Sequence, residues 1–200
     1  MILKDALNLY RLILASQSPR RKMLLEGLDL DFDIIVREDI DEEFPEDLGK
    51  MEIPVYLAEH KSDHYLDLLN QNTILITADT IVWHDNKLVG KPGSLEEAHD
   101  ILEGLSGSTH EVVTGVCLRS GNSKKLFSSH SRVFFRELTE QEIDYYVSNY
   151  RPLDKAGAYG IQEWIGYVGI EKIEGSFYNV MGLPVQMLYT ELLDFLKAIG

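Results

Sequence analysis

Short apolar runs bounded by polar segments recur along the chain and predict buried β-strands. Five runs have the length of such strands: residues 11–15, 32–36, 73–78, 110–118 and 130–135. The third run ends at the polar pair Asp79-Thr80 and is continued by Ile81-Val82-Trp83. After it, Asp85-Asn86 indicates a turn into another short strand at residues 87–89. A Gly-Asn turn region joins the last two strands of the five.

Helix-start signals lie between these strands. Ser18 is a candidate N-cap, with Pro19 at the first helical position of a short helix that includes residues 22–28. Ser94 opens a capping-box pattern with Glu97. The remaining signals predict helices at residues 54–69, 94–105, 139–148 and 184–197. Because strands and helices alternate, we expect an α/β fold in a single domain spanning residues 1–200.

The acidic composition narrows the range of partners. The formal net charge is −14, from 33 acidic and 19 basic residues, so the surface repels a long nucleic acid. A small triphosphate is compatible with this charge, because a few basic side chains and a divalent cation in one cleft outweigh the overall field. The chain has no secretory signal and no apolar run of the ~20 residues that cross a bilayer, and it has one cysteine, Cys117. We therefore expect a cytoplasmic protein without membrane attachment, in which Cys117 is a buried thiol.

The loop after the first predicted strand combines hydroxyl and guanidinium groups. Its sequence is Ser16-Gln17-Ser18-Pro19-Arg20-Arg21, and a helix follows it. Free backbone N–H groups at a helix N-terminus suit phosphate, and paired arginines bind phosphate oxygens bidentately. The same pattern is equally typical of a capped helix with two exposed arginines. No Gly-x-x-x-x-Gly-Lys-Ser/Thr pattern occurs, so this is not a Walker loop.

Two later segments also gather reactive residue types. Asp79 at a strand end can hold Mg²⁺ or orient an attacking water, and Lys91, between Gly and Pro, can reach a phosphate. Residues 153–162 interleave small residues with Asp, Lys, Tyr and Gln, which indicates backbone close to a ligand. Each segment also has a simple structural interpretation, a turn in the first case and an irregular turn with a surface ion pair in the second.

Taken in order, these motifs resemble the Maf family of proteins. The matching segments are residues 14–21 (Leu-Ala-Ser-Gln-Ser-Pro-Arg-Arg), 78–82, 90–92, 105–107 and 154–162 (Asp-Lys-Ala-Gly-Ala-Tyr-Gly-Ile-Gln), and the resemblance spans about residues 11–196. It implies a fold related to inosine triphosphate pyrophosphatases, with a mixed twisted sheet flanked by helices and two lobes around a central cleft. It also implies a homodimer that depends on Mg²⁺ or Mn²⁺ and hydrolyses a nucleoside triphosphate to the monophosphate and pyrophosphate.

The resemblance also assigns expected roles to individual residues. Asp79 corresponds to the catalytic acid-base residue that activates water for attack on the α-phosphorus. Glu42 corresponds to an acidic residue after the second strand that, with Asp79, is expected to hold the metal. Positions tied to substrate choice are Arg20, Thr80 and Gln162. The phosphate and metal environment is expected to comprise Ser16, Arg21, Lys61, Lys91, Asp154 and Lys155.

Within the family, residues 154–162 are similar to the subgroup that hydrolyses dTTP and UTP. Two departures stand out: Glu163-Trp164-Ile165 replaces the usual glycine-rich continuation, and about ten extra residues precede the first strand. Two alternatives remain open at this point. One is the same reaction on another base, such as 7-methyl-GTP or a damaged purine. The other is a regulator of septum formation that binds nucleotide without hydrolysing it.

Overall fold

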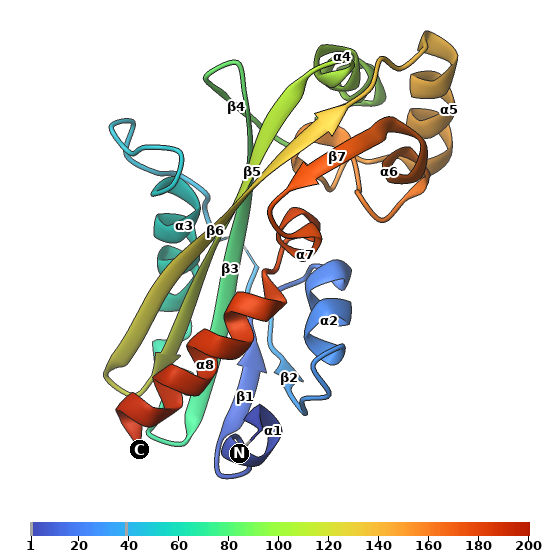
Figure 1. Cartoon of the computed structure of the whole chain (residues 1–200). Coiled ribbons are helices and arrows are strands. Elements are labelled where there is room, and N and C mark those ends of the chain that lie inside the picture. The colour runs from blue at the N-terminus through green and yellow to red at the C-terminus, as the bar shows by residue number, and fades with distance from the viewer. Residues whose placement is uncertain (1, 39) are drawn as a thin grey trace. The chain divides into compact units, whose positions relative to one another are not determined.

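The computed structural model describes residues 2–38 and 40–200, and its core is a seven-stranded mixed sheet (Figure 1). The strand order is β2-β1-β3-β5-β6-β7, and β4 pairs with β3 off this path. The strands are β1 Arg11–Leu14, β2 Asp33–Ile34, β3 Thr73–His84, β4 Lys87–Val89, β5 Thr109–Ser120, β6 Ser123–Phe135 and β7 Ile170–Glu174. With the helices below, this arrangement confirms the expected α/β class.

The helices fall between the strands, as the alternating pattern predicts. The α-helices are α1 Leu3–Ala6, α2 Pro19–Glu26, α3 Ile53–Asp63, α4 Leu95–Leu105, α5 Glu140–Tyr150, α6 Trp164–Gly169, α7 Phe177–Met181 and α8 Val185–Ile199. Two 3₁₀ turns add η1 Leu66–Leu68 and η2 Ala156–Ala158. None of the described helices is long and apolar enough to cross a membrane.

The chain divides into two compact units. Unit 1 contains residues 1–79, 114–129 and 182–200, and unit 2 contains residues 80–113 and 130–181. The three long strands β3, β5 and β6 each contribute residues to both units. The division within β3 falls between Asp79 and Thr80.

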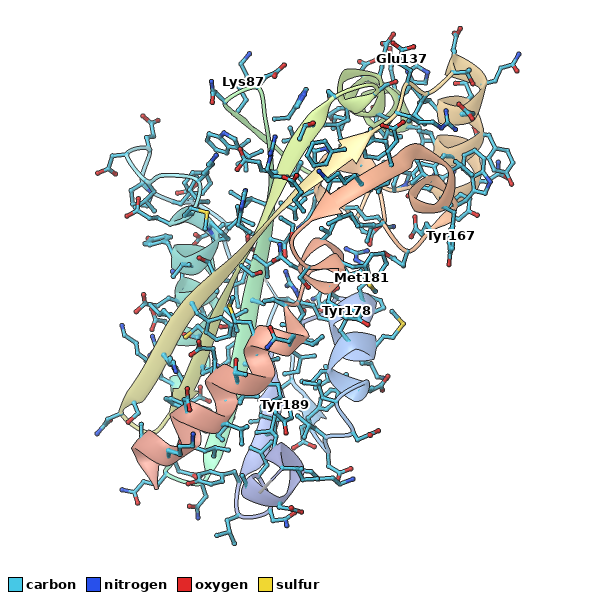
Figure 2. The ribbon with its side chains drawn as sticks, in the orientation of Figure 1. Lys87, Glu137, Tyr167, Tyr178, Met181 and Tyr189 are labelled. Atoms are coloured by element: carbon cyan, nitrogen blue, oxygen red, sulfur yellow. The ribbon has the colours of Figure 1, made fainter. Side chains whose placement is uncertain are left out.

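Unit 1 is built on parallel pairing of β1 with β2 and β3, where Ile13 lies opposite Asp33 and Leu75. Helix α3 packs on this sheet: the Thr77 hydroxyl of β3 donates to the carbonyl of Ala58 at 2.6 Å. The extra N-terminal residues form α1, where the Leu3 backbone N–H donates to the Tyr189 hydroxyl of α8 at 3.3 Å (Figure 2). Since Leu3 is fully buried, this extension contributes to the core of the unit.

Unit 2 contains the β3–β4 hairpin, one end each of β5 and β6, the strand β7 and the helices α4 to α7. The β3–β4 turn at Asp85-Asn86 has positive φ at both residues (47° and 59°), which is the geometry that matches the twist of a tight hairpin. Strand β7 pairs antiparallel with β6. Thr139 and Glu142 form a reciprocal capping box at the start of α5, and the Ser94 hydroxyl accepts from the Glu97 N–H at the start of α4. The predicted starts of both helices are confirmed.

Several boundaries differ from the predictions. Asp79 lies inside the continuous twelve-residue strand β3 rather than at a strand end, because a lysine on α3 balances its carboxylate there. The expected helix at 54–69 ends at Asp63 and is followed by η1. The expected strand at 32–36 is only two residues long. Short elements without a strong periodic pattern, namely α1, α6, α7 and β7, were not predicted.

Candidate functional site

In unit 1, the loop between β1 and α2 presents a helix N-terminus lined by hydroxyl groups. The Ser18 hydroxyl caps α2 by accepting from the Arg21 N–H at 3.4 Å, and Pro19 opens the helix, as predicted. The Ser16 hydroxyl accepts from the Ser18 N–H at 3.2 Å. The first turn of α2 therefore carries its positive dipole end next to two arginines.

The guanidinium of Arg21 lies within a set of opposing charges. Its Nε donates to the Gly182 carbonyl at 2.8 Å, which holds the side chain across the loop that precedes α8. Burial lowers the pKa of Arg21, the carboxylates of Asp79 and Glu42 act to raise it, and the charge of Arg20 acts to lower it. Two predicted phosphate-binding residues and the two predicted metal ligands therefore interact electrostatically within unit 1.

Lys61 on α3 connects the two acidic residues. Its ammonium lies 2.7 Å from Glu42 Oε1 and 2.5 Å from Asp79 Oδ1. The side chains of Lys61 and Asp79 are largely buried, at 17% and 11% exposed, whereas Glu42 comes from the loop before α3 and is half exposed. A buried carboxylate requires such a partner, because unpaired charge is costly away from water. Unit 1 therefore brings the carboxylates of Asp79 and Glu42 together at the ammonium of Lys61.

The donor chemistry at this point fits a divalent cation. Oxygens of Glu42 and Asp79 converge on a single positive group, so the same two carboxylates can face another cation. Carboxylate oxygens, together with phosphate oxygens and water, are the ligands that Mg²⁺ and Mn²⁺ prefer. Asp39 belongs to the acidic run 38–47 and lies outside the described residues.

In unit 2, the predicted ligand-binding residues lie around the 154–162 loop, a name we keep for residues 154–162. Its backbone includes two left-handed residues, Gly157 (φ 74°) and Ala158 (φ 56°). The Gly157 N–H donates to the Gly90 carbonyl at 3.1 Å, so the Gly90-Lys91-Pro92 segment adjoins this loop. A side chain at Gly157 would meet Val82 at 3.1 Å, and the loop therefore packs on the part of β3 that follows Thr80.

The side chains of the 154–162 loop differ in how many polar partners they have. Lys155 is almost buried, with its ammonium 2.7 Å from Asp154 Oδ1 and 3.3 Å from Glu163 Oε1. Among the described residues, the buried Oε1 of Gln162 has no hydrogen-bond partner. A buried carbonyl oxygen without a hydrogen-bond partner is costly, so this atom is a candidate acceptor for a ligand or a water molecule. Neither Glu163 nor its contacts were predicted as part of the site; the only signal was its departure from the family pattern.

The predicted site residues are divided between the two units. Unit 1 holds Ser16, Arg20, Arg21, Glu42, Lys61 and Asp79, and unit 2 holds Thr80, Lys91, Asp154, Lys155 and Gln162. Contacts within unit 1 link Lys61 directly to both acidic residues. Within unit 2, Lys155 contacts Asp154, and Gly90, which precedes Lys91, contacts Gly157 of the 154–162 loop.

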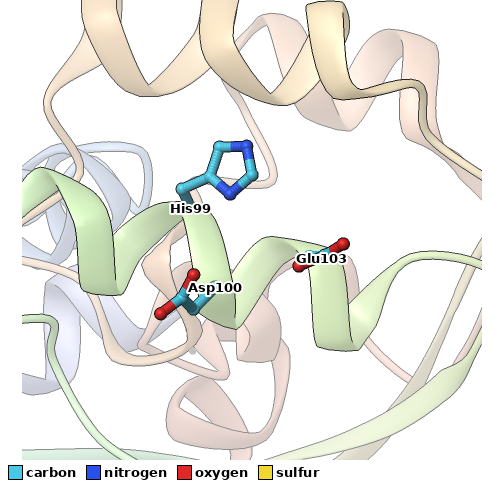
Figure 3. Close-up of side chains that lie close together, drawn as sticks. All are labelled: His99, Asp100 and Glu103. Carbon is cyan, nitrogen blue, oxygen red and sulfur yellow. The ribbon is translucent and has the colours of Figure 1, made fainter.

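One further set of potential metal ligands lies on α4. His99, Asp100 and Glu103 bring their ligand atoms within 4.8 Å of one another (Figure 3). Asp100 and Glu103 are exposed, and His99 Nε2 already lies 3.4 Å from Asp144 of α5. This geometry is that of solvated acidic groups on a helix surface, and the set shares no member with the predicted site.

Comparison with known proteins adds independent information. A family profile described as Maf-like protein matches residues 11–195. The chain is 52% identical over 191 residues to a dTTP/UTP pyrophosphatase from Parabacteroides distasonis, covering 96% of this chain and 99% of that protein. It is 53% identical over 186 residues to a dTTP/UTP pyrophosphatase from Bacteroides thetaiotaomicron, covering 93% and 96%. Among solved structures, a HAM1 protein from Coxiella burnetii is 16% identical, with a TM-score of 0.40 over 63% of this chain and 73% of that one.

Proposed function

The chain belongs to the Maf family, and from this membership we propose that it hydrolyses dTTP and UTP to the nucleoside monophosphate and pyrophosphate. The names of its close relatives support this substrate choice. The observation that carries the chemistry is the arrangement of Asp79, Glu42 and Lys61, with Arg21 in the same electrostatic field. A protein that only binds nucleotide does not need a buried acid among these basic groups.

Asp79 is the general base in this proposal. A water oxygen attacks the α-phosphorus and gives a proton to the Asp79 carboxylate. The bond between the α-phosphorus and the α–β bridging oxygen breaks, and its electron pair leaves with pyrophosphate. Lys61, 2.5 Å from Asp79 Oδ1, orients the carboxylate and keeps it in place inside β3. The described contacts pair no nucleophilic side chain with a base in this group, so direct attack by water is the simplest route.

The positive groups of unit 1 bind the phosphates. Arg20 and Arg21, in the first turn of α2, offer guanidinium donors to the oxygens of the leaving pyrophosphate at the positive end of the helix dipole, and Arg20 also keeps the place in substrate choice that the resemblance assigns. Glu42 and Asp79 would hold a Mg²⁺ or Mn²⁺ ion. When bound, such an ion spreads the negative charge of the triphosphate and polarises its phosphoryl oxygens.

We assign the unit 2 residues to substrate binding on the basis of the family resemblance. Lys91, Asp154 and Lys155 belong to the phosphate and metal environment, and Thr80 and Gln162 to base recognition. The orphaned Oε1 of Gln162 supports this role, because uracil and thymine carry an N3–H that such an acceptor can bind. A site that hydrogen-bonds a base edge rejects a base lacking that group strongly.

We further propose that the enzyme is a cytoplasmic homodimer, again from the resemblance. The net charge of −14 supports a small nucleotide rather than a nucleic acid polymer as its partner.

The first test is pyrophosphate release from a panel of nucleoside triphosphates with Mg²⁺ or Mn²⁺. Wild type is compared with Asp79→Asn, which removes the base but keeps the size of the side chain. We expect release from dTTP and UTP, with kcat reduced by about 10²- to 10⁴-fold or more in the variant and nucleotide affinity retained. The control is Asp33→Asn on β2, which alters only an exposed ion pair with Arg11 of β1 and should leave kcat unchanged.

Each outcome bears on a different part of the proposal. An unchanged kcat in Asp79→Asn would remove Asp79 from catalysis. Release from 7-methyl-GTP or a damaged purine alone would keep the chemistry and reject the assigned base preference. Measurable nucleotide binding without release from any substrate would favour a regulatory protein.

A further inference from the structure

The backbone of the 154–162 loop is in a conformation that needs external support. Gly157 has φ 74°, and the next residue, Ala158, also lies in the left-handed region with φ 56°. For a residue with a Cβ this conformation costs about 1–2 kcal/mol. Such strain persists where the surrounding contacts determine the conformation, and it is found preferentially at functional sites.

One carboxylate supplies contacts at both ends of the strained stretch. Glu163 Oε1 lies 3.3 Å from the ammonium of Lys155, which directly precedes η2. Glu163 Oε2 accepts a hydrogen bond from the Tyr146 hydroxyl of α5. The Tyr146 oxygen in turn accepts from the Gly160 N–H at 2.9 Å, two residues after Ala158. Lys155 and Gly160 are therefore tied to the same side chain.

The surroundings leave this arrangement little freedom. Burial and the hydrogen bond to Glu163 raise the pKa of Tyr146, so its hydroxyl keeps the proton that it donates. A Cβ at Gly160 would lie 2.7 Å from Glu163 Cδ, so the carboxyl group packs directly on the loop backbone. The Glu163 N–H also donates to the Gly160 carbonyl at 2.9 Å. Lys155 itself is only 8% exposed.

We propose that Glu163 is a positioning residue for nucleotide binding: its carboxylate holds Lys155 directly and Gly160 through Tyr146, and thereby sets the 154–162 loop. This inference rests on the proposed function, because it takes Lys155 as a phosphate contact and Gln162 as a base contact. Glu163 does not touch the substrate. It stands where the resemblance leads one to expect a glycine-rich continuation.

A positioning role makes a specific kinetic prediction. In the proposed function, the groups that Glu163 holds bind the substrate in the ground state as well as in the transition state, whereas Asp79 acts on the reacting atoms. Loss of positioning should therefore weaken binding and raise KM more than it lowers kcat. Groups that orient a binding side chain typically contribute 10- to 100-fold.

The test compares Glu163→Gln and Tyr146→Phe with Glu142→Gln. The first variant removes the charge opposite Lys155, and the second removes the link to Gly160. Glu142 is the matched control: it is a similarly half-buried carboxylate of unit 2 that accepts hydrogen bonds and pairs with Arg136, but it caps α5 and lies outside the loop. Measurements are KM and kcat for dTTP and UTP, and amide hydrogen exchange across residues 155–162.

We expect Glu163→Gln to raise KM about 10- to 100-fold with kcat changed less than about threefold, and to speed exchange in the loop. Tyr146→Phe should also raise KM and speed exchange in the loop, whereas Glu142→Gln should change neither KM nor loop exchange. An unchanged KM, or unchanged loop exchange, in Glu163→Gln and Tyr146→Phe would overturn the inference. If wild type releases no pyrophosphate at all, the proposed function fails. Faster loop exchange confined to the Glu163 and Tyr146 variants would still support the positioning of the loop.

Discussion

At the scale of single residues, a charged carboxylate, that of Asp79, lies within a largely buried strand. Asp79 lies within β3, next to the buried Ala78, where it pairs with the ammonium of Lys61 and lies in the electrostatic field of Arg21. Removing one partner of such a pair leaves the other unbalanced, which is more costly than the pair itself. The contact with Lys61 both offsets the cost of burying the Asp79 carboxylate and orients that carboxylate. The stability of the fold and the orientation of Asp79 therefore depend on the same contact.

A second buried titratable residue, His110 of β5, predicts a dependence of stability on pH. It is 1% exposed, its Nε2 lies 2.7 Å from the Tyr159 hydroxyl, and its Nδ1 has no hydrogen-bond partner among the described residues. Burial, aided by the charge of His84, lowers the pKa of His110 to about 3. In the unfolded chain histidine takes up a proton near pH 6.5, whereas the folded protein resists it until near pH 3.

The free energy of unfolding should therefore fall as the pH drops from about 6.5 towards 3. This residue contributes at most about 1.4 kcal/mol per pH unit, because the unfolded state then binds one more proton than the folded state. Urea unfolding of wild type and His110→Gln at pH 7, 6 and 5 isolates the effect, since all other groups are shared. A stability difference between the two proteins that does not vary with pH would contradict it.

At the scale of elements, the local signals in the sequence carried most of the fold. Four of the five strand runs, the Asp85-Asn86 turn, the caps at Ser18 and Ser94 and the helix start at residue 139 are confirmed, because each depends on side chains a few residues apart. The sequence predicted that Ile81-Val82-Trp83 continues this strand, but it placed Asp79 at a strand end; its place inside one unbroken strand, β3, depends on a lysine 18 positions away. The contacts of Glu163 were missed for the same reason: they join α5, the 154–162 loop and the start of α6. The roles assigned to the site residues stay predictions.

The packing of α3 on β5 predicts the effect of a small substitution. A Cβ at Gly115 would lie 2.3 Å from the backbone of Pro54 and Val55, so alanine must push α3 away from the strand. We expect Gly115→Ala to lower the free energy of unfolding by about 1–3 kcal/mol or more. Because α3 carries Lys61, pyrophosphate release should fall as well. Thermal unfolding and the pyrophosphate assay measure the two effects.

The control for this substitution is Gly104→Ala on α4. A Cβ at Gly104 has nothing within 4 Å, and alanine is favoured over glycine in a helix by about 1 kcal/mol. This variant should be as stable as wild type or more stable, with normal activity. A harmless Gly115→Ala would show that α3 does not pack on β5 as described, and a destabilised Gly104→Ala would contradict the open surroundings of Gly104 on α4.

At the scale of the whole molecule, chain topology and charge set the behaviour. Each unit is assembled from separated stretches, and β3, β5 and β6 contribute to both, so no single cut in the sequence releases an intact unit. The acidic surface keeps polyanions away, whereas Arg21 and Lys61 of unit 1 lie in the field of the Asp79 and Glu42 carboxylates. Selectivity for a small anion thus comes from local groups that oppose the net charge.

The proposed homodimer is a prediction at this scale. Large aromatic side chains of unit 2 remain exposed in the single chain, among them Tyr145, Phe177, Tyr178 and Tyr167, of which Tyr167 is 82% exposed. Figure 2 labels Tyr167 and Tyr178. Exposed aromatic residues are enriched at protein interfaces. Light scattering after size exclusion should give twice the 22.8 kDa of one chain. A single-chain mass at every concentration measured would reject the dimer.

Because Cys117 is buried, the rate at which its thiol is labelled can measure local opening of the fold. Cys117 is the sole cysteine in the sequence, it is fully buried in β5, and its thiol donates to the Ser62 hydroxyl of α3 at 3.3 Å. Burial also raises its pKa, so the reactive thiolate is scarce while the fold is closed. A thiol-specific reagent added under native conditions can therefore react only when α3 lifts from the sheet. The rate of labelling reports how often that happens in water, without denaturant and without an introduced probe.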